Sequence, residues 1–367
     1  MQDTFKKGLG DRYDGWRVRN VDAVFNVIPF IMRTRMDSQN LFEENIPIEN
    51  IEKFIRKHRE DMPDLTFMHV IIAALIRMIA VKPYLNRFIM WNKIYARNTI
   101  SLSLMIKRKH SNVETNVKPE FDPTATLTDV VNTMNQMVNQ NLEDDANNNM
   151  DKLAGLFGYI PAFLLRFVIW LVRWMDNFGI LPRFINRLSP FHCSAFLTNV
   201  GSVGIGPIYH HLYEFGTCSF FVAMGTKHKF HTVGPNGERV EKRFIGLKFV
   251  TDERICDGEY YASAMKVLRR LLNDPELLMA PPDNIPIDDG VPKKKLKVKK
   301  INQTELLRNI RRAVSPPVLF CLFQRRPHTA AAFVLCEYYR LSRTPVAALN
   351  SSMSLSSSSA CACMSVQ

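Results

Sequence analysis

The sequence lacks the patterns that mark several common classes of protein. Its seven cysteines are odd in number and only Cys361 and Cys363 are closely spaced, which fits neither a disulfide framework nor a zinc site. It contains no Gly-rich phosphate loop, metal-binding cluster or recognisable Ser/His/Asp order, so we expect no metal. The start, MQDTFKKGLGDRYDGW, lacks the apolar core of a signal peptide. We therefore expect a cytoplasmic protein with free thiols.

Acidic residues are also scarce at one end of the chain. The formal charge is +13, but residues 283–367 hold 13 Lys/Arg against 5 Asp/Glu, so this tail carries 13 − 5 = +8 and residues 1–282 only +5. The pI of 9.4 belongs mostly to the tail, and we expect no nucleic-acid partner. The tail holds KKKLKVKK and a serine-rich end, which predict a basic, low-complexity, disordered segment after residue 282.

One long apolar run interrupts an otherwise soluble pattern. The stretch GLFGYIPAFLLRFVIWLV, residues 155–172, approaches the length of a membrane span. Pro161 and Arg166 interrupt it, and an arginine at the bilayer centre would cost about 2.5 to 3.5 kcal/mol. We expect a hairpin or helix within an apolar insertion or lid at residues 155–188. It would cover an apolar substrate channel or touch a membrane surface.

Hydrophobic periodicity predicts a mixture of helices and strands between residues 21 and 282, after an N-terminal arm at residues 1–20. Residues 66–82 are apolar nearly all round and stop at Pro83, as expected for a central helix. Residues 99–108 alternate, as in a half-buried strand. The remaining expected elements are helices at 48–60 and 126–142 and strands at 194–201, 218–225 and 243–250. The pattern predicts an α+β domain.

A second informative stretch is 250-VTDERICDGEYYASAMKVLRRLL-272. It passes from a β-type run through Asp257-Gly258 into an amphipathic helix. On that helix, Tyr261, Met265, Leu268 and Leu272 share one face, which predicts a core-facing helix.

This arrangement resembles the HxxxDG signature of the superfamily of chloramphenicol acetyltransferase and the 2-oxo acid dehydrogenase acyltransferases. Here the segment reads Asp252-Glu253-Arg254-Ile255-Cys256-Asp257-Gly258. The stretch 194-SAFLTNVGSVGI-205 resembles the strand of that family that ends in Ser-Asn-Leu-Gly, with Thr198-Asn199-Val200-Gly201 in the matching places. The run 218-CSFFVAMG-225 is similar to the strand that follows it. The resemblance covers roughly residues 20–275.

The resemblance implies both a fold and an activity. Members are two-layer α+β sandwiches with helices packed on one face of a mixed sheet. They usually form homotrimers, with the active site in a channel between subunits. They transfer an acyl group between coenzyme A and a thiol, hydroxyl or amine. The implied ligands are therefore coenzyme A, or acyl-CoA, and an acceptor that the sequence does not identify. Since no lipoyl domain or Ala/Pro-rich linker is present, the chain resembles a stand-alone catalytic domain.

The sequence departs from the family at the catalytic histidine, whose place is taken by Glu253. An imidazole has an ordinary pKa of about 6.5, whereas a glutamate has one of about 4.3, so a glutamate is the weaker base by roughly 3 kcal/mol. Three hypotheses follow. Glu253 is the base in a dry channel, the adjacent His210 and His211 take the proton instead, or the domain no longer catalyses acyl transfer.

The resemblance also implies roles for the neighbouring residues. Asp257 would be ion-paired with an arginine, with Arg17 or Arg19 as the candidates. Gly258 would permit a tight turn into the helix. The hydroxyl of Thr198 would donate to the oxyanion of the tetrahedral intermediate.

Asn199, Gly258 and Arg254 would line the substrate channel. The alternative to an enzyme is a catalytically degenerate trimeric binding or scaffold protein. In that case the apolar run at 155–172 would contact lipid or a partner.

Overall fold

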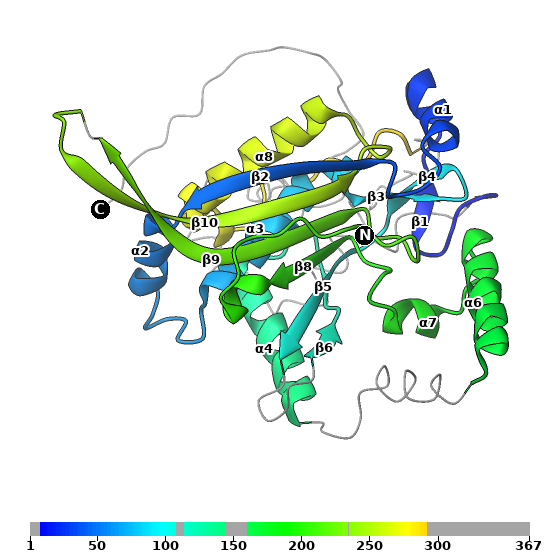
Figure 1. Cartoon of the computed structure of the whole chain (residues 1–367), viewed down its shortest axis with the longest axis horizontal. Helices are drawn as coiled ribbons and strands as arrows, with labels where there is room; N and C mark the ends of the chain where they lie inside the picture. The colour runs from blue at the N-terminus through cyan, green and yellow to red at the C-terminus, as the bar shows by residue number, and fades with distance from the viewer. Residues whose placement is uncertain (1–7, 108–113, 144–159, 234, 292–367) are drawn as a thin grey trace, which may run out of the picture. The chain divides into compact units, whose positions relative to one another are not determined.

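The computed structural model describes residues 8–107, 114–143, 160–233 and 235–291 (Figure 1). These residues lie in the first of two units of the chain, Met1–Val298. Their strands are β1 (Gly15–Arg17), β2 (Gln39–Pro47), β3 (Arg87–Met90), β4 (Lys93–Arg97), β5 (Ile100–Lys107), β6 (Glu114–Val117), β7 (Glu120–Phe121), β8 (Ala195–Asn199), β9 (Phe220–Val233) and β10 (Arg239–Asp252). Their helices are α1 (Ala23–Ile31), α2 (Glu49–Lys57), α3 (Phe67–Val81), α4 (Leu127–Glu143), α6 (Ala162–Asn177), α7 (Arg183–Leu188) and α8 (Gly258–Asn273), with short 3-10 turns η2 (Pro83–Asn86), η3 (Val200–Val203) and η4 (Pro275–Leu278).

The main sheet is seven-stranded and mixed. Its strand order is β2-β10-β9-β8-β5-β6, and β7 pairs with the first two residues of β5. Strand β10 is antiparallel to both of its neighbours, β2 and β9, whereas β8 runs parallel to both β9 and β5. Together with the helices, this sheet confirms the predicted α+β class.

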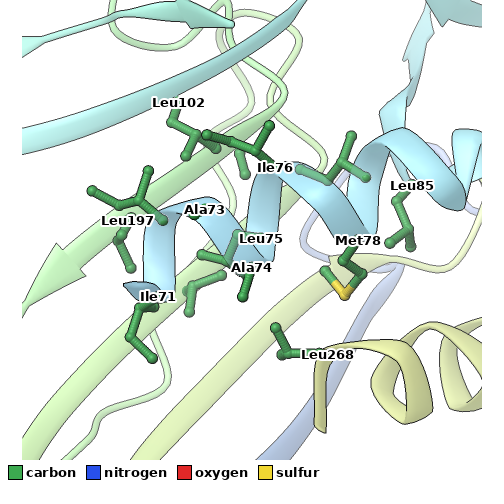
Figure 2. Packing of buried hydrophobic residues seen from close by; sticks show 14 of the residues in the cluster. Ile71, Ala73, Ala74, Leu75, Ile76, Met78, Leu85, Leu102, Leu197 and Leu268 are labelled. Atoms are coloured by element: carbon green, nitrogen blue, oxygen red, sulfur yellow. The ribbon is translucent and has the colours of Figure 1, made fainter. Parts of the chain in front are cut away.

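The core lies on the face of the sheet that α3 and α8 cover. Helix α3 is buried nearly all round because it packs between the sheet and other helices (Figure 2). The side chain of Thr66 caps its first turn by accepting a hydrogen bond from the backbone N–H of His69. On α8 the four predicted core residues, Tyr261, Met265, Leu268 and Leu272, are all buried. The predicted central helix and core-facing helix are therefore both confirmed.

The opposite face of the sheet carries a smaller cluster. Phe196, Phe221 and Val250 project from β8, β9 and β10 and pack with Leu212 of the loop that crosses this face. Cys193 and Cys218 complete the cluster, and both thiols are free. Residues 204–217 partly cover this face, which we call the helix-free face because α3 and α8 lie on the other one.

The predicted arm at residues 1–20 is not separate from the fold. Strand β1 pairs with β4 in a three-stranded sheet, β1-β4-β3, and Trp16 is buried in the main core. Strands β3 and β4 are joined by Trp91 and Asn92, both in the left-handed region with φ of 46° and 57°. Such a pair of residues forms the tight turn that matches the twist of a hairpin.

The predicted domain boundary at residue 282 was set too early. The guanidinium of Arg87 is bound by both carboxylate oxygens of Asp288 at 2.7 Å, and both side chains are buried. Val291 is buried in the main core. The sequence after Pro282 reads as polar and irregular, but a buried arginine requires a carboxylate, and this segment supplies it. Residues 292–367, most of the predicted tail, lie outside the described residues.

The apolar run predicted as an insertion is helical where it is described. Helix α6 and the short helix α7 occupy much of residues 160–188, and residues 155–159 lie outside the described part. In the described residues, no helix is both long and apolar enough to cross a membrane.

Candidate functional site

The junction between β10 and α8 is held by a buried ion pair. β10 ends at Asp252, and its carboxylate accepts two hydrogen bonds from the guanidinium of Arg254, each 2.8 Å long. Ser38 donates a further hydrogen bond to Asp252 at 3.1 Å, and Arg254 also donates to the carbonyl of Met32. The side chain of Arg254 is only 3% exposed, and its hydrogen bonds to Asp252 and Met32 hold the loop in place. The prediction that it lines a substrate channel is wrong.

Asp257 has a different role from the one the family resemblance implied. It is exposed and is the N-cap of α8, where its side chain accepts a hydrogen bond of 2.8 Å from the backbone N–H of Tyr260. Within the described residues no ion pair joins it to Arg17 or Arg19, so that prediction is wrong. The ion pair that fixes the loop is made five residues earlier, by Asp252, because that carboxylate is the buried one.

Gly258 does not require a glycine conformation. It is the first residue of α8, its φ lies outside the left-handed region, and a Cβ built there would meet nothing within 4 Å. The prediction of a tight turn that depends on this glycine is therefore wrong. The space beside Gly258, at the N-terminus of α8, is open.

Glu253 lies in the turn between the strand and the helix and is half-buried. Its backbone N–H donates to the carbonyl of Ser38 at 2.8 Å. In the described part of the chain, no hydrogen bond or ion pair is made by its carboxylate. The backbone of Glu253 is thus fixed, while its side chain is not oriented by another group.

Thr198 and Asn199 end strand β8. Thr198 is half-buried and, two residues after Phe196, projects from the helix-free face of the sheet. The side-chain oxygen of Asn199 accepts from the backbone N–H of Ser202 and so starts the turn η3. Within this turn, Gly201 lies so close to β9 that a Cβ there would meet the carbonyl oxygen of Gly225 at 2.3 Å. Gly201 is therefore required by the close packing of η3 against β9.

His210 stacks on the same helix-free face. Its ring lies parallel to that of Phe221, with centroids 4.2 Å apart, and burial lowers its pKa. The Nδ1 atom lies 3.0 Å from the backbone nitrogen and 3.1 Å from the carbonyl oxygen of His211, so the backbone engages this atom in either tautomer. The neighbouring ring of His211 is exposed and contacts Tyr213 edge-on. The two histidines therefore have different environments, and His210 is the one held against the sheet.

The sheet register separates Glu253 from Thr198 and His210. Thr251 of β10 pairs with Phe220 of β9, whereas Thr198 of β8 pairs with Ala223. At about 3.3 Å per residue, this places Glu253 and Thr198 roughly 15 Å apart along the strand direction, on strands that are not neighbours. The fold brings Thr198 and His210 to one face, and leaves Glu253 at the other end of the sheet.

The sequence patterns did not indicate a buried group of polar residues around Asp176, near the end of α6. His192 lies with Nε2 2.9 Å from a carboxylate oxygen of Asp176 and with Nδ1 2.7 Å from the hydroxyl of Ser189. Arg12 donates to the other oxygen of Asp176 at 2.7 Å and to its carbonyl. The signal that could have revealed this group is a single carboxylate, Asp176, at the end of an apolar helix.

This group resembles a serine–histidine–aspartate relay but is closed to substrates. Ser189, His192 and Asp176 are 7%, 2% and 3% exposed. Burial alone would raise the pKa of Asp176, but the hydrogen bond from His192 and the charge of Arg12 outweigh it, so the pKa is lowered. The group joins α6, α7, the start of β8 and the N-terminal segment, so its role is to anchor α6 to the sheet.

Potential metal ligands are dispersed. In residues 8–107, 114–143, 160–233 and 235–291, no group of three or more His, Cys, Asp or Glu side chains is placed to hold a metal ion.

No family model and no curated protein matches the chain. Among solved structures, it is similar to dihydrolipoamide acetyltransferase of Azotobacter vinelandii, with a TM-score of 0.47, 9% identity, and coverage of 74% of this chain and 93% of that one. A probable dihydrolipoamide acetyltransferase of Listeria monocytogenes gives a TM-score of 0.45, 10% identity, and coverage of 69% and 92%. A chloramphenicol acetyltransferase gives 0.43, 10%, and coverage of 69% and 96%. Likenesses this distant say nothing of activity or substrate.

Proposed function

We propose that the chain is an acyltransferase that moves an acyl group from coenzyme A to a thiol, hydroxyl or amine, on a sandwich of the chloramphenicol acetyltransferase type. The observation that carries the proposal is the placement of Thr198 and His210. A hydroxyl and a half-buried imidazole occupy one face of the sheet, where the Thr-Asn-Val-Gly segment that resembles the family motif ends β8.

The chemistry assigned to these residues follows from their contacts. In the tautomer in which Nδ1–H of His210 donates to the carbonyl of His211, Nε2 carries the lone pair, and burial lowers the pKa so that the ring is neutral near pH 7. Nε2 takes the proton of the acceptor as its sulfur, oxygen or nitrogen attacks the thioester carbonyl. Thr198 donates to the oxyanion, and the C–S bond then breaks as the imidazolium returns its proton to the coenzyme A sulfur.

Glu253 is the second candidate for the base. Because the register places it roughly 15 Å from Thr198 along the strand direction, it could serve the same site only from a neighbouring copy of the chain. A homotrimer with a channel between copies would allow this. Light scattering on the full chain should therefore give the mass of a trimer, and a monomer would remove Glu253 from the mechanism.

The proposal is tested by acetyl transfer from acetyl-CoA to a small thiol. His210→Ala should lower the rate by about 10²- to 10⁴-fold, as loss of a general base does. Thr198→Val should lower it by about 10²- to 10³-fold through loss of an oxyanion donor. His231→Ala, which alters an exposed histidine on β9, is the matched control and should leave the rate unchanged.

The same assay decides between the candidates. If Glu253→Gln abolishes transfer while His210→Ala does not, the base is Glu253. If the wild-type chain neither transfers an acyl group nor binds coenzyme A, the enzymatic proposal fails and the chain is a binding or scaffold protein on a reused fold.

A further inference from the structure

Helix α6 presents an exposed aromatic stripe. Phe163, Phe167, Trp170, Trp174 and Phe178 follow one another at intervals of three or four residues, so they lie on one side of the helix. Every one of them is exposed, from 44% at Trp174 to 76% at Phe163. Core-facing helices of globular proteins bury such a stripe, and this helix turns it outward.

The opposite side of α6 faces the body of the protein. Leu165, Val168, Val172 and Met175 are half-buried, and Asp176 is fixed by Arg12 and His192. The anchoring group therefore sets the rotation of the helix about its axis. It holds the aromatic stripe away from the protein. Figure 1 shows the helix itself, in green.

The exposed charged residues of the segment 160–188 are all arginines. Arg166 and Arg173 lie roughly 90° round the helix from the centre of the stripe, and both are exposed. Arg183 and Arg187 of α7 are exposed as well. Within residues 160–188 the one acidic residue is Asp176, which is buried and paired. The exposed region is thus aromatic and cationic, with no exposed carboxylate of its own.

The stripe extends onto the β3–β4 hairpin. Trp91, at the tip, is 53% exposed, and its ring contacts that of Phe178 with centroids 4.9 Å apart. Its φ of 46° is unusual for a bulky residue, so the turn holds an indole outward at some conformational cost. The ammonium of Lys93 lies 5.1 Å from the same ring and adds a cation beside it.

We propose that this surface, the aromatic stripe of α6 with Trp91 and the flanking arginines, docks on a bilayer rich in anionic lipid. Phe and Trp rings favour the boundary between headgroups and acyl chains, and arginine favours lipid phosphates. Helix α6 has 16 residues, or about 24 Å, too short for the roughly 30 Å hydrocarbon core, so it lies along the surface.

A second copy of this chain, docking through the same face, is a poorer partner than the bilayer. Two such faces brought together would oppose arginines to arginines without an exposed carboxylate between them. The membrane supplies the missing negative charge and the apolar layer together.

The test is flotation of the full chain with vesicles of phosphatidylcholine alone and of phosphatidylcholine with about 30% phosphatidylglycerol, a content at which each arginine near the surface contributes measurably. We expect binding to the anionic vesicles that weakens with salt. Trp91, Trp170 and Trp174 are exposed, whereas Trp16 is buried, so binding should also shift the tryptophan emission to shorter wavelength.

The double variant Phe167→Ala/Trp170→Ala should weaken binding at least tenfold on both readouts. Arg166→Glu/Arg173→Glu should weaken it by about fivefold or more per arginine and remove the preference for anionic lipid. The matched controls are Phe230→Ala and Arg239→Glu, exposed residues of the β9–β10 hairpin, and they should bind as the wild type does.

Two results would overturn the proposal: the wild-type chain does not float with anionic vesicles, or the aromatic variant floats as well as the wild type. In the first case, a change of mass in light scattering on the aromatic variant would assign the surface to contact between copies. Circular dichroism melting of each variant separates loss of binding from loss of folding, and acyl transfer in the absence of vesicles should be unchanged by all four.

Discussion

The ion pair that the motif suggests for Asp257 is made instead by Asp252, five residues earlier. The letters Asp-Gly draw attention to Asp257, but Asp257 is an exposed helix cap, and the carboxylate that holds the loop is Asp252. The difference is one of burial, which a local motif does not encode. A buried carboxylate must be paired, whereas an exposed one has water.

This difference in burial predicts unequal costs for two similar substitutions. Asp252→Asn should lower the free energy of unfolding by about 3 to 5 kcal/mol, because it leaves the buried Arg254 without its counter-charge. Asp257→Ala should cost only about 1 kcal/mol, the usual value of a lost N-cap. Urea unfolding of the two variants measures both, and equal costs would contradict the assignment.

Asp176 predicts a particular dependence of stability on pH. Its pKa in the folded protein is lowered, so it stabilises the fold above its unfolded pKa of about 3.9 and this contribution is lost as pH falls through the lower, folded value. Asp176→Asn should therefore lower the melting temperature at pH 7. It should also flatten the fall in melting temperature as the pH drops below about 4, the unfolded pKa. A variant with the wild-type pH profile would show that the pair with Arg12 and His192 is not formed.

At the scale of elements, the glycines of the two motif segments behave differently. Gly201→Ala should destabilise the protein by about 1 to 3 kcal/mol, because the added Cβ would meet the backbone of Gly225. Gly258→Ala has open space and a compatible backbone, so it should be neutral or stabilising by up to about 1 kcal/mol. Thermal melting of this pair tests whether η3 is packed against β9 as described.

Much of the secondary structure could be predicted because it depends on local patterns. Helix α3 was predicted from an apolar run that stops at Pro83, and β5 from its strict alternation. The anchoring group of Asp176, His192 and Arg12 could not, because Arg12 and Asp176 are 164 residues apart and only the tertiary fold brings them together. The register that separates Glu253 from Thr198 was hidden for the same reason. For the candidate site, the sequence identified the residues but not which of them share a face.

The segment that follows Pro282 also leads to a testable prediction about stability. A chain ending after Pro282 should lose at least about 3 kcal/mol of stability relative to one ending after Val298, because it removes Asp288 and leaves Arg87 buried and unpaired. Urea unfolding compares the two chains. If they unfold alike, residues 283–291 do not belong to the folded unit.

At the scale of the whole molecule, one sheet has two unlike faces. The face under α3 and α8 is a conventional apolar core. The other face carries Thr198, and the loop that crosses it brings His210 onto the strands. The Cβ-free backbone at Gly225 and Gly246 lets Pro207 of that loop lie directly on the strands. A site on this second face can be altered without disturbing the core, as expected where chemistry is added to a stable fold.

Calorimetric titration of the full chain with coenzyme A is the sharpest test of the proposed acyltransferase function. We expect saturable binding of one coenzyme A per chain, unchanged in His210→Ala, because His210 moves a proton and does not hold the ligand. Thr198→Val should bind equally well, since its hydroxyl is needed by the transition state and not by the ground state. If the wild-type chain shows no binding of coenzyme A, the proposed acyltransferase function is contradicted.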